Sequence, residues 1–335
     1  MSIVTCQEPK SKVKGIVTLR ANETRLGINE SYQTPARVQS YVATQDLVVP
    51  KDALFNRIIS VLINETNPTT RSIRILEPGM GPAAFTRFVL RRPFTDRFDE
   101  IYIEGADISH GMLAYAAEVI EALYQSDVNG SRVTVSLSAG VNCIDVADAF
   151  YWAIQSQNRR FDAIVASQFE HYCPNSSTSP LADRYRGLKV PFSTKREFRR
   201  HCYDLLDKGG FYFTIDDRLG ESPEEHKEIC DAWDGHVVRQ FTDDAILAHL
   251  DSLNPALARN LRLNYDRTRP MAALIGVAAK AREHRRAICC EEIEPLSATR
   301  RDFVEIFGED NVFCMMHPSI ETHPGFYLMW AVKRG

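Results

Sequence analysis

The sequence predicts a three-layer α/β protein with a doubly wound, mostly parallel sheet that ends in an antiparallel hairpin. Strand-like and helix-like segments alternate between residues 72 and 215, which favours parallel strands with helices on both faces. A Gly-x-Gly turn leads from the first strand directly into a helix. The last two strand-like runs are joined by a turn-rich loop at 317–325, which is too short for a crossover helix and therefore indicates an antiparallel pair.

We expect residues 1–70 to form an N-terminal helical lid. After a polar lead-in, apolar residues recur at helical spacing between 34 and 66, for example at Val38 and Val42. Pro50 is typical of a residue at the start of a second helix in this stretch.

The elements of the sheet follow in regular order. Runs rich in β-branched and aromatic residues predict strands at 72–76, 100–105, 132–137, 161–166, 211–215, 311–316 and 326–332. Apolar residues at helical spacing predict helices at 82–91, 111–124, 146–157 and 195–206.

These segments define three parts of the chain. Residues 71–216 and 291–335 are expected to form the core domain. The stretch 217–290 is charged and mostly helical, and it is too long for a simple connection. We therefore interpret it as a helical insertion that caps the core.

The composition excludes several classes of partner. The chain has 335 residues with 40 basic and 44 acidic side chains, a net charge of −4, so no basic surplus points to nucleic acid. No segment approaches the roughly 20 apolar residues of a membrane helix, and the cysteines form no Cys-x-x-Cys pair. We expect a cytoplasmic protein with no membrane partner and no metal site, and the sequence makes no prediction of oligomeric state.

The stretch ILEPGMGPA at residues 75–83 contains the first site motif. Its strand ends in Glu77, and Gly79 and Gly81 then turn directly into a helix. Glycine lets the backbone turn sharply and lets a ligand lie against it without obstruction by a Cβ atom. The amides of a helix N-terminus bind carboxylates or hydroxyls, so the motif predicts a nucleotide-like ligand.

The next strand ends in a second motif, GADISHGML at residues 105–113. Asp107 stands at the tip of this strand, where a carboxylate can accept hydrogen bonds from both hydroxyls of a ribose. Ser109 is expected to cap the helix that follows.

Together the two motifs resemble motif I and the subsequent acidic loop of the class I S-adenosylmethionine-dependent methyltransferases. The resemblance covers residues 72–216 and the C-terminal hairpin, about half of the chain. It implies a Rossmann-like sheet with S-adenosylmethionine as the cofactor, and the hairpin argues against an NAD-dependent dehydrogenase. It implies that Asp107 holds the ribose, and the other implied cofactor residues are Glu77, Gly79 and Gly81 for the methionine part and Ile108 and Met112 for the adenine.

Two positions depart from the pattern of that family. The third glycine of motif I is replaced by Ala83. In the loop after the third strand, the family often has an aspartate that binds the adenine amino group. Asn142 is the nearest candidate here, because its amide can both accept and donate hydrogen bonds.

The cluster Glu170, His171 and Tyr172 follows the fourth strand, whose carboxyl end faces the reactive sulfonium in this family. His171 is the candidate general base, Glu170 the candidate orienting carboxylate, and Tyr172 an aromatic face for the sulfonium cation. The alternative is that these side chains only pack the junction between strand and helix. Tyr32 and Tyr41 are expected to line the lid and the substrate pocket.

The sequence therefore predicts an enzyme, an S-adenosylmethionine-dependent methyltransferase that acts on a small molecule. Two alternatives stay open. One is a cyclase that consumes S-adenosylmethionine and releases methylthioadenosine, as azetidine-2-carboxylate synthases do, and the other is a non-catalytic S-adenosylmethionine-binding protein. Methyl transfer depends mainly on alignment and desolvation, so the sequence does not identify the acceptor.

Overall fold

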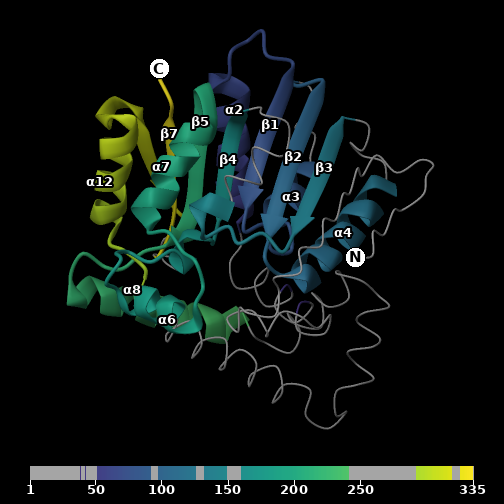
Figure 1. The fold of residues 1–335 in the computed structure, drawn as a ribbon. Coiled ribbons are helices and arrows are strands. Elements are labelled where there is room, and N and C mark those ends of the chain that lie inside the picture. The colour runs from purple at the N-terminus through teal and green to yellow at the C-terminus, as the bar shows by residue number, and fades with distance from the viewer. Residues whose placement is uncertain are drawn as a thin grey trace.

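The described residues form one seven-stranded sheet (Figure 1). The computed structural model describes Val38, Val42 and residues 51–91, 97–125, 132–148, 160–240, 292–318 and 325–334. The strands are β1 Ser72–Pro78, β2 Glu100–Asp107, β3 Val133–Ala139, β4 Phe161–Ser167, β5 Leu206–Asp217, β6 Val312–Met316 and β7 Phe326–Val332.

The strand order is β3-β2-β1-β4-β5-β7-β6, and β7 runs antiparallel to both of its neighbours while the other described pairs are parallel. This confirms the predicted Rossmann-like class with its antiparallel C-terminal hairpin. The order reverses between β1 and β4, and ligands of open α/β sheets bind at the carboxyl ends of the strands beside such a reversal.

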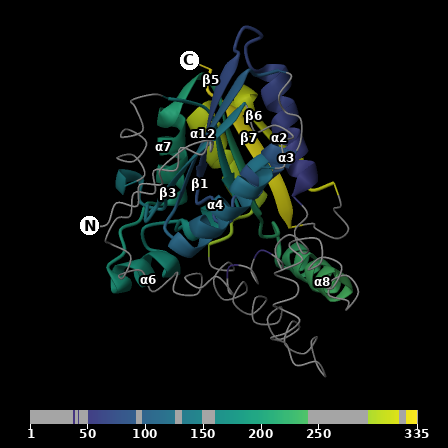
Figure 2. The ribbon, with the colours of Figure 1, turned by 90° about the vertical axis from the view of Figure 1, so that its right-hand side faces the viewer.

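Helices cover both faces of the sheet, as the edge-on view in Figure 2 shows. One face carries α2 Asp52–Glu65, α3 Ala84–Arg91 and α4 His110–Gln125, and the other carries α7 Lys195–Leu205 and α12 Leu296–Phe307. In both views α6 Pro180–Leu188 and α8 Pro223–Gln240 lie beyond the carboxyl ends of the parallel strands.

The sheet separates two apolar cores. Alternate residues of β1 face opposite sides, with Ile75 in the core under α2, α3 and α4 and Leu76 in the core under α7 and α12. Leu54, Ile58 and Leu62 of α2 are fully buried in the first core. Helix α2 is therefore a fixed part of the core layer, and only residues before Asp52 remain candidates for a lid.

Two of the helices in the described residues are missing from the sequence-based prediction. Helix α6 begins with a recognisable signal, because Ser179 accepts a hydrogen bond from the amide of Ala182 and Pro180 occupies the first helical position. Helix α12 follows Pro295 and buries Phe303 in the second core, where its ring stacks on Tyr212 of β5 with centroids 5.4 Å apart.

Strand β5 begins earlier than the sequence predicts. Helix α7 ends at Leu205, and Leu206 already pairs with Phe161 of β4, with an irregularity in the register before Phe211. Gly209 has φ +83°, a conformation that glycine adopts readily, so the Gly-Gly pair forms this irregularity and does not end the helix. The predicted helix at 146–157 and the insertion from 241 to 290 lie largely outside the described residues.

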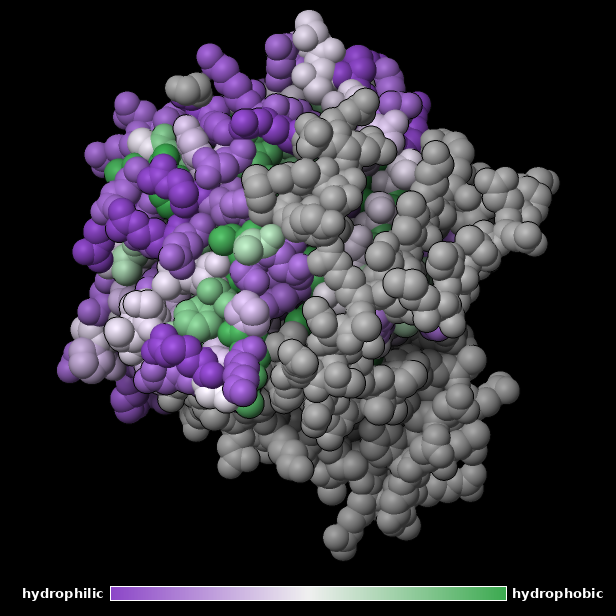
Figure 3. All heavy atoms as spheres, viewed as in Figure 1, coloured by the Kyte–Doolittle hydropathy of each residue, from purple (hydrophilic) through white to green (hydrophobic). Residues whose placement is uncertain are grey.

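The described part of the face in Figure 3 is mostly hydrophilic, with small hydrophobic areas between charged side chains. Leu188 and Phe313 are the large hydrophobic residues exposed among those described. Within the described ranges, no helix has the length and apolar character needed to cross a membrane.

Candidate cofactor and acceptor site

In the Gly-x-Gly turn after β1, every second residue has a left-handed backbone conformation. Gly79, Gly81 and Ala83 have φ values of +60°, +53° and +60°. Ala83 stands where the family that this chain resembles has its third glycine, and the left-handed conformation costs an alanine roughly 1–2 kcal/mol. The amide of Met80 donates to the carbonyl of Ala106 at 3.0 Å, which fixes the turn to the end of β2.

The surroundings of the two glycines differ. A Cβ atom at Gly79 would lie 2.0 Å from the ring of Phe169, so this glycine is required for packing against the segment after β4. At Gly81 the nearest atom to such a Cβ, the carbonyl oxygen of Gly79, is 4.0 Å away. Among the described residues, the space on the Cβ side of Gly81 is therefore open, whereas that of Gly79 is filled by Phe169.

Glu77 is almost fully buried and already has partners. Its carboxylate accepts a hydrogen bond from the hydroxyl of Thr86 at 2.6 Å and further bonds from the amides of Phe85 and Thr86 at the start of α3. Burial raises the pKa of Glu77 to about 7 despite these bonds. The structure places Glu77 beneath the turn, where it supports the helix N-terminus.

Asp107 connects the two sequence motifs. Its Oδ2 accepts a hydrogen bond from the amide of Gly81 at 2.9 Å, and its Oδ1 accepts one from the amide of Ser109 at 2.7 Å. Burial raises the pKa of Asp107, while these backbone bonds oppose that shift. Each carboxylate oxygen has a second lone pair, so the group can still accept two ribose hydroxyls.

The residues assigned to the adenine lie around the next loops. Ser109 caps α4 by accepting a hydrogen bond from the amide of Met112 at 3.2 Å. Met112 is buried against Val38 and Val42, the described residues of the N-terminal segment. Ile108 is half-buried beside Asp107.

Asn142 follows β3 at the same edge of the sheet. Its side-chain amide donates to the carbonyl of Pro191 at 2.8 Å, and its backbone amide donates to Asp148 at 2.8 Å. One amide hydrogen is thus already engaged, and the assignment of Asn142 to the adenine stays a prediction.

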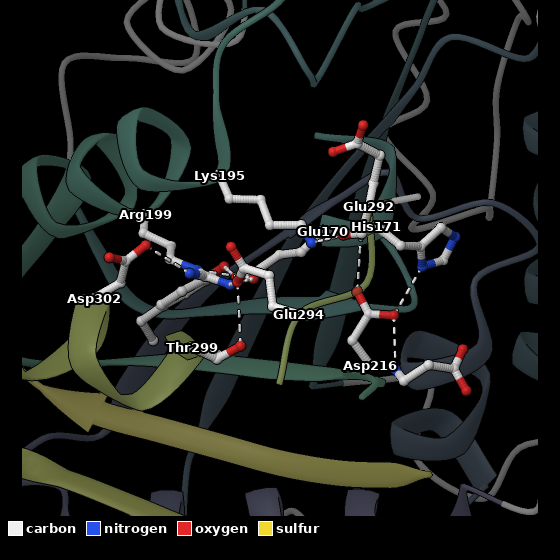
Figure 4. Close-up of polar contacts among 11 residues, drawn as sticks. Glu170, His171, Lys195, Arg199, Asp216, Glu292, Glu294, Thr299 and Asp302 are labelled. Carbon is white, nitrogen blue, oxygen red and sulfur yellow. Dashed lines mark hydrogen bonds and ion pairs between the residues drawn. The ribbon is translucent and has the colours of Figure 1, made fainter. Parts of the chain in front are cut away.

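A histidine–aspartate pair lies at the carboxyl ends of β4 and β5 (Figure 4). His171 belongs to the short 3-10 helix η3 Glu170–Tyr172, and its Nδ1 is 2.8 Å from Oδ1 of Asp216. Asp216 Oδ2 also accepts a bond from the backbone amide of His171 at 3.0 Å. Burial alone would raise the pKa of Asp216, but His171 and Lys195 together hold this pKa below its ordinary value.

Glu170 does not orient His171, which corrects the prediction from the sequence. Its carboxylate accepts two hydrogen bonds from Arg199, at 2.9 and 2.6 Å, and one from the hydroxyl of Tyr212. The carboxylate that contacts His171 is Asp216, which the sequence shows only as the end of a strand. The ring centroid of Tyr172 lies 4.3 Å from that of His171.

Arg199 is the centre of a buried network that the sequence did not indicate. Its side chain is 1% exposed and pairs with Glu170, with Glu294 at 3.1 Å and with Asp302 at 2.9 Å (Figure 4). Glu294 lies just after the insertion, so the network fixes the returning chain to the segment that carries His171. Lys195 adds a hydrogen bond to the carbonyl of Glu292.

Tyr32 and Tyr41, assigned to the lid, lie outside the described residues. Among the residues that the structure describes, no group of three His, Cys, Asp or Glu side chains is placed to hold a metal ion.

No family model matches the sequence, and no curated protein matches it. The structure is similar to that of the CurJ carbon methyltransferase, with TM-score 0.46, 14% identity, and 93% of this chain and 61% of that chain covered. It is also similar to the CMeT domain of the citrinin polyketide synthase, with TM-score 0.48, 13% identity, and coverages of 92% and 59%. The plantazolicin methyltransferase BpumL, solved with S-adenosylhomocysteine, gives TM-score 0.44, 10% identity, and coverages of 93% and 97%.

The chain thus spans about three fifths of the length of the first two of these structures. Similarities at this level carry no conclusion about activity, which has to be argued from the site.

The raised pKa of Glu77 predicts a pH-dependent stability. A carboxyl whose pKa is higher in the folded state stabilises the fold below its unfolded pKa and loses that contribution as pH rises through the folded pKa of about 7. Glu77→Gln mimics the protonated form at every pH. The free energy of unfolding of the wild type should fall relative to this variant by up to about 3 kcal/mol between pH 4.5 and 8, as measured by urea titration. A difference that does not change with pH would contradict this prediction.

Asp107→Ala should weaken S-adenosylmethionine binding at least about tenfold, because charge-assisted hydrogen bonds to the ribose contribute roughly 1.5–3 kcal/mol each. Calorimetry on a variant with native circular dichroism checks this. Asp99→Ala is the matched control, since Asp99 is an exposed carboxylate before β2 that pairs with Arg71, at the opposite end of the strand. Equal affinities of Asp107→Ala and the wild type would remove Asp107 from the site.

Proposed function

We propose that this chain is an S-adenosylmethionine-dependent methyltransferase that acts on a small molecule. The observation that carries the proposal is the bond between the carboxylate of Asp107 and the amide of Gly81, which joins the open glycine turn to the acidic strand tip. Asp107 keeps acceptor capacity for two hydroxyls beside this turn, which suits a ligand that combines an amino acid and a ribose. When bound, the cofactor supplies an electrophilic methyl group on a sulfonium.

His171 is proposed as the general base toward the acceptor. Asp216 is ionised at neutral pH because its pKa is lowered, so it accepts the hydrogen of His171 Nδ1. The lone pair then resides on Nε2, which can take a proton from the acceptor. Asp216 also holds the backbone amide of His171, so it fixes both the position and the tautomer of the base.

The N-terminal segment is proposed to cover the cofactor, with Tyr32 and Tyr41 on its inner side. The burial of Val38 and Val42 against Met112 supports this placement, because Met112 follows the acidic loop. A cover of this kind excludes water from the sulfonium and defines the acceptor pocket. The insertion at 217–290 is proposed to complete it.

Analysis of the adenosine product by mass spectrometry tests the proposed reaction. Methyl transfer releases S-adenosylhomocysteine, whereas intramolecular cyclisation releases methylthioadenosine. Release of methylthioadenosine without an added acceptor would refute methyl transfer.

His171→Ala should lower turnover about a hundredfold or more, within the range of general base catalysis, while the dissociation constant for S-adenosylmethionine stays within about twofold. Single-turnover kinetics and calorimetry on the same protein separate the two effects. His201→Ala, on α7, is the matched histidine control and should retain turnover. Full activity of His171→Ala would leave His171 with a packing role only.

Hydrogen exchange tests the cover. Backbone amides in residues 25–50 should become more protected when S-adenosylhomocysteine binds, because a closing segment gains hydrogen-bonded order. Exchange in this segment that is identical with and without the ligand would exclude it from the site.

A further inference from the structure

Strand β6 forms one edge of the sheet, and its residues differ in kind from those of the other edge. The strand order places β3 and β6 at the two ends of the sheet. Strand β3 has Thr134, Ser136 and Ser138 at alternate positions, and none of its residues is exposed. Strand β6 consists of the residues VFCMM, of which Phe313 and Cys314 are exposed. An edge strand that contains neither a charge nor a proline is open to pairing with another strand.

The register of the hairpin determines which backbone groups of β6 point outward. The amide of His317 donates to the carbonyl of Phe326 at 3.0 Å, so these two residues form a hydrogen-bonded pair. Hydrogen-bonded and non-hydrogen-bonded pairs alternate along an antiparallel ladder. The N–H and C=O groups of Cys314 and Met316 therefore point away from β7, as does the carbonyl of Val312. Among the described residues, no backbone group bonds to the outward groups of Cys314 and Met316.

The side chains of β6 are apolar on both faces of the sheet. On the face of α2, Phe313 stacks on Trp330 of β7 with ring centroids 5.5 Å apart, and it is still 40% exposed. Met315 lies on the same face and is half-buried against the first core. On the face of α12, Val312 and Met316 pack in the second core. A strand that pairs with β6 therefore gains apolar cross-strand contacts on each face.

The charged residues beside β6 favour an antiparallel partner of the same kind. Exposed Glu309 and Asp310 directly precede the strand. Arg218 and Arg300 lie farther along it, since burial raises the pKa of the Cys314 thiol and the positive charges of these two arginines oppose that shift. Arg300 is exposed, and its partner Glu309 in the same chain is 3.5 Å away. Two antiparallel copies of β6 bring the acidic start of each strand beside the arginines of the other, whereas parallel copies would place like charges side by side.

We propose that two copies of this chain form a dimer through antiparallel pairing of their β6 strands, with Cys314 of one copy opposite Cys314 of the other on the two-fold axis. In this register the two Cys314 residues exchange both backbone bonds, and the amide of each Met316 bonds to the carbonyl of Val312 in the other copy. Phe313 lies opposite Met315, which is a favourable pairing of an aromatic ring with sulfur.

A second copy is the partner that repeats both the register and the charge pattern in the complementary direction, as a two-fold interface requires. The dimer joins the two sheets edge to edge. Strand β6 is separated from β1 and β4 by two further strands, so the carboxyl ends of β1 and β4 stay open in each copy. The proposal does not depend on the proposed function.

Sedimentation equilibrium of the full chain tests the interface, and the wild type should be a dimer. Because Cys314 is exposed, Cys314→Lys should leave the fold intact and place two like charges opposite each other. It should raise the dissociation constant of the dimer at least about a hundredfold, and Cys314→Glu should do the same. An equimolar mixture of the two variants should dimerise again, because opposite charges then meet on the axis.

Leu188→Lys is the matched control for the effect of a new surface charge. Leu188, on α6, is the other large hydrophobic residue that is exposed among those described. This variant should remain as dimeric as the wild type.

Disulfide cross-linking tests the register. The Cα atoms of a hydrogen-bonded antiparallel pair are about 5.5 Å apart, within the range of roughly 4.4–6.8 Å that a disulfide spans. Copper(II) phenanthroline as the oxidant should therefore join the two Cys314 thiols, which a non-reducing gel shows as a band of twice the mass. Cys314→Ser should remain a dimer and lose this band.

A wild type that stays monomeric would overturn the proposal, whether another part of the chain or another molecule covers β6. A dimer that tolerates Cys314→Lys, or a mixture of the two charged variants that stays monomeric, would exclude β6 as the interface. A dimer that gives no cross-link through Cys314 would exclude the register.

Discussion

The carboxylate of Asp107 holds together the two loops on which the cofactor site depends. Its bonds to the amides of Gly81 and Ser109 contribute roughly 1.5–3 kcal/mol each, since both are charge-assisted. The residue assigned to the ribose therefore also binds the turn assigned to the methionine part, so one side chain links the two assigned regions.

The buried guanidinium of Arg199 connects several segments near the carboxyl ends of β4 and β5. Arg199 pairs with Glu170 in the segment that carries His171, with Glu294 after the insertion and with Asp302 on α12. Desolvation offsets much of the attraction in such a network, so its main consequence is positional. The network holds three segments that are far apart in the sequence in fixed positions. One of them carries His171, which contacts Asp216.

Features that depend on residues close together in the sequence were predicted from it, and features that depend on residues far apart in the sequence were not. The strands, the hairpin and the cap at Ser109 depend on local pattern and were predicted from the sequence. The choice between Glu170 and Asp216 was not, because it depends on how η3 turns against a strand 45 residues away in the chain. Arg199 gave no local signal for the same reason. The sequence shows that Gln168, a long polar residue, directly follows an apolar strand. Its left-handed backbone, with φ +53°, cannot be predicted from composition.

The unusual backbone conformations lie on both sides of the reversal in strand order. Chain connections leave β1 and β4 toward opposite faces of the sheet, so both strands must end in sharp turns that border the same crevice. Each turn is hydrogen-bonded to the strand on its outer side. The amide of Met80 donates to the carbonyl of Ala106 at the end of β2, and the amide of Gln168 donates to the carbonyl of Ile215 on β5. The two turns contact each other through the ring of Phe169, which packs on Gly79. The topology that makes the sheet doubly wound thus also brings the two turns together at one end of the sheet.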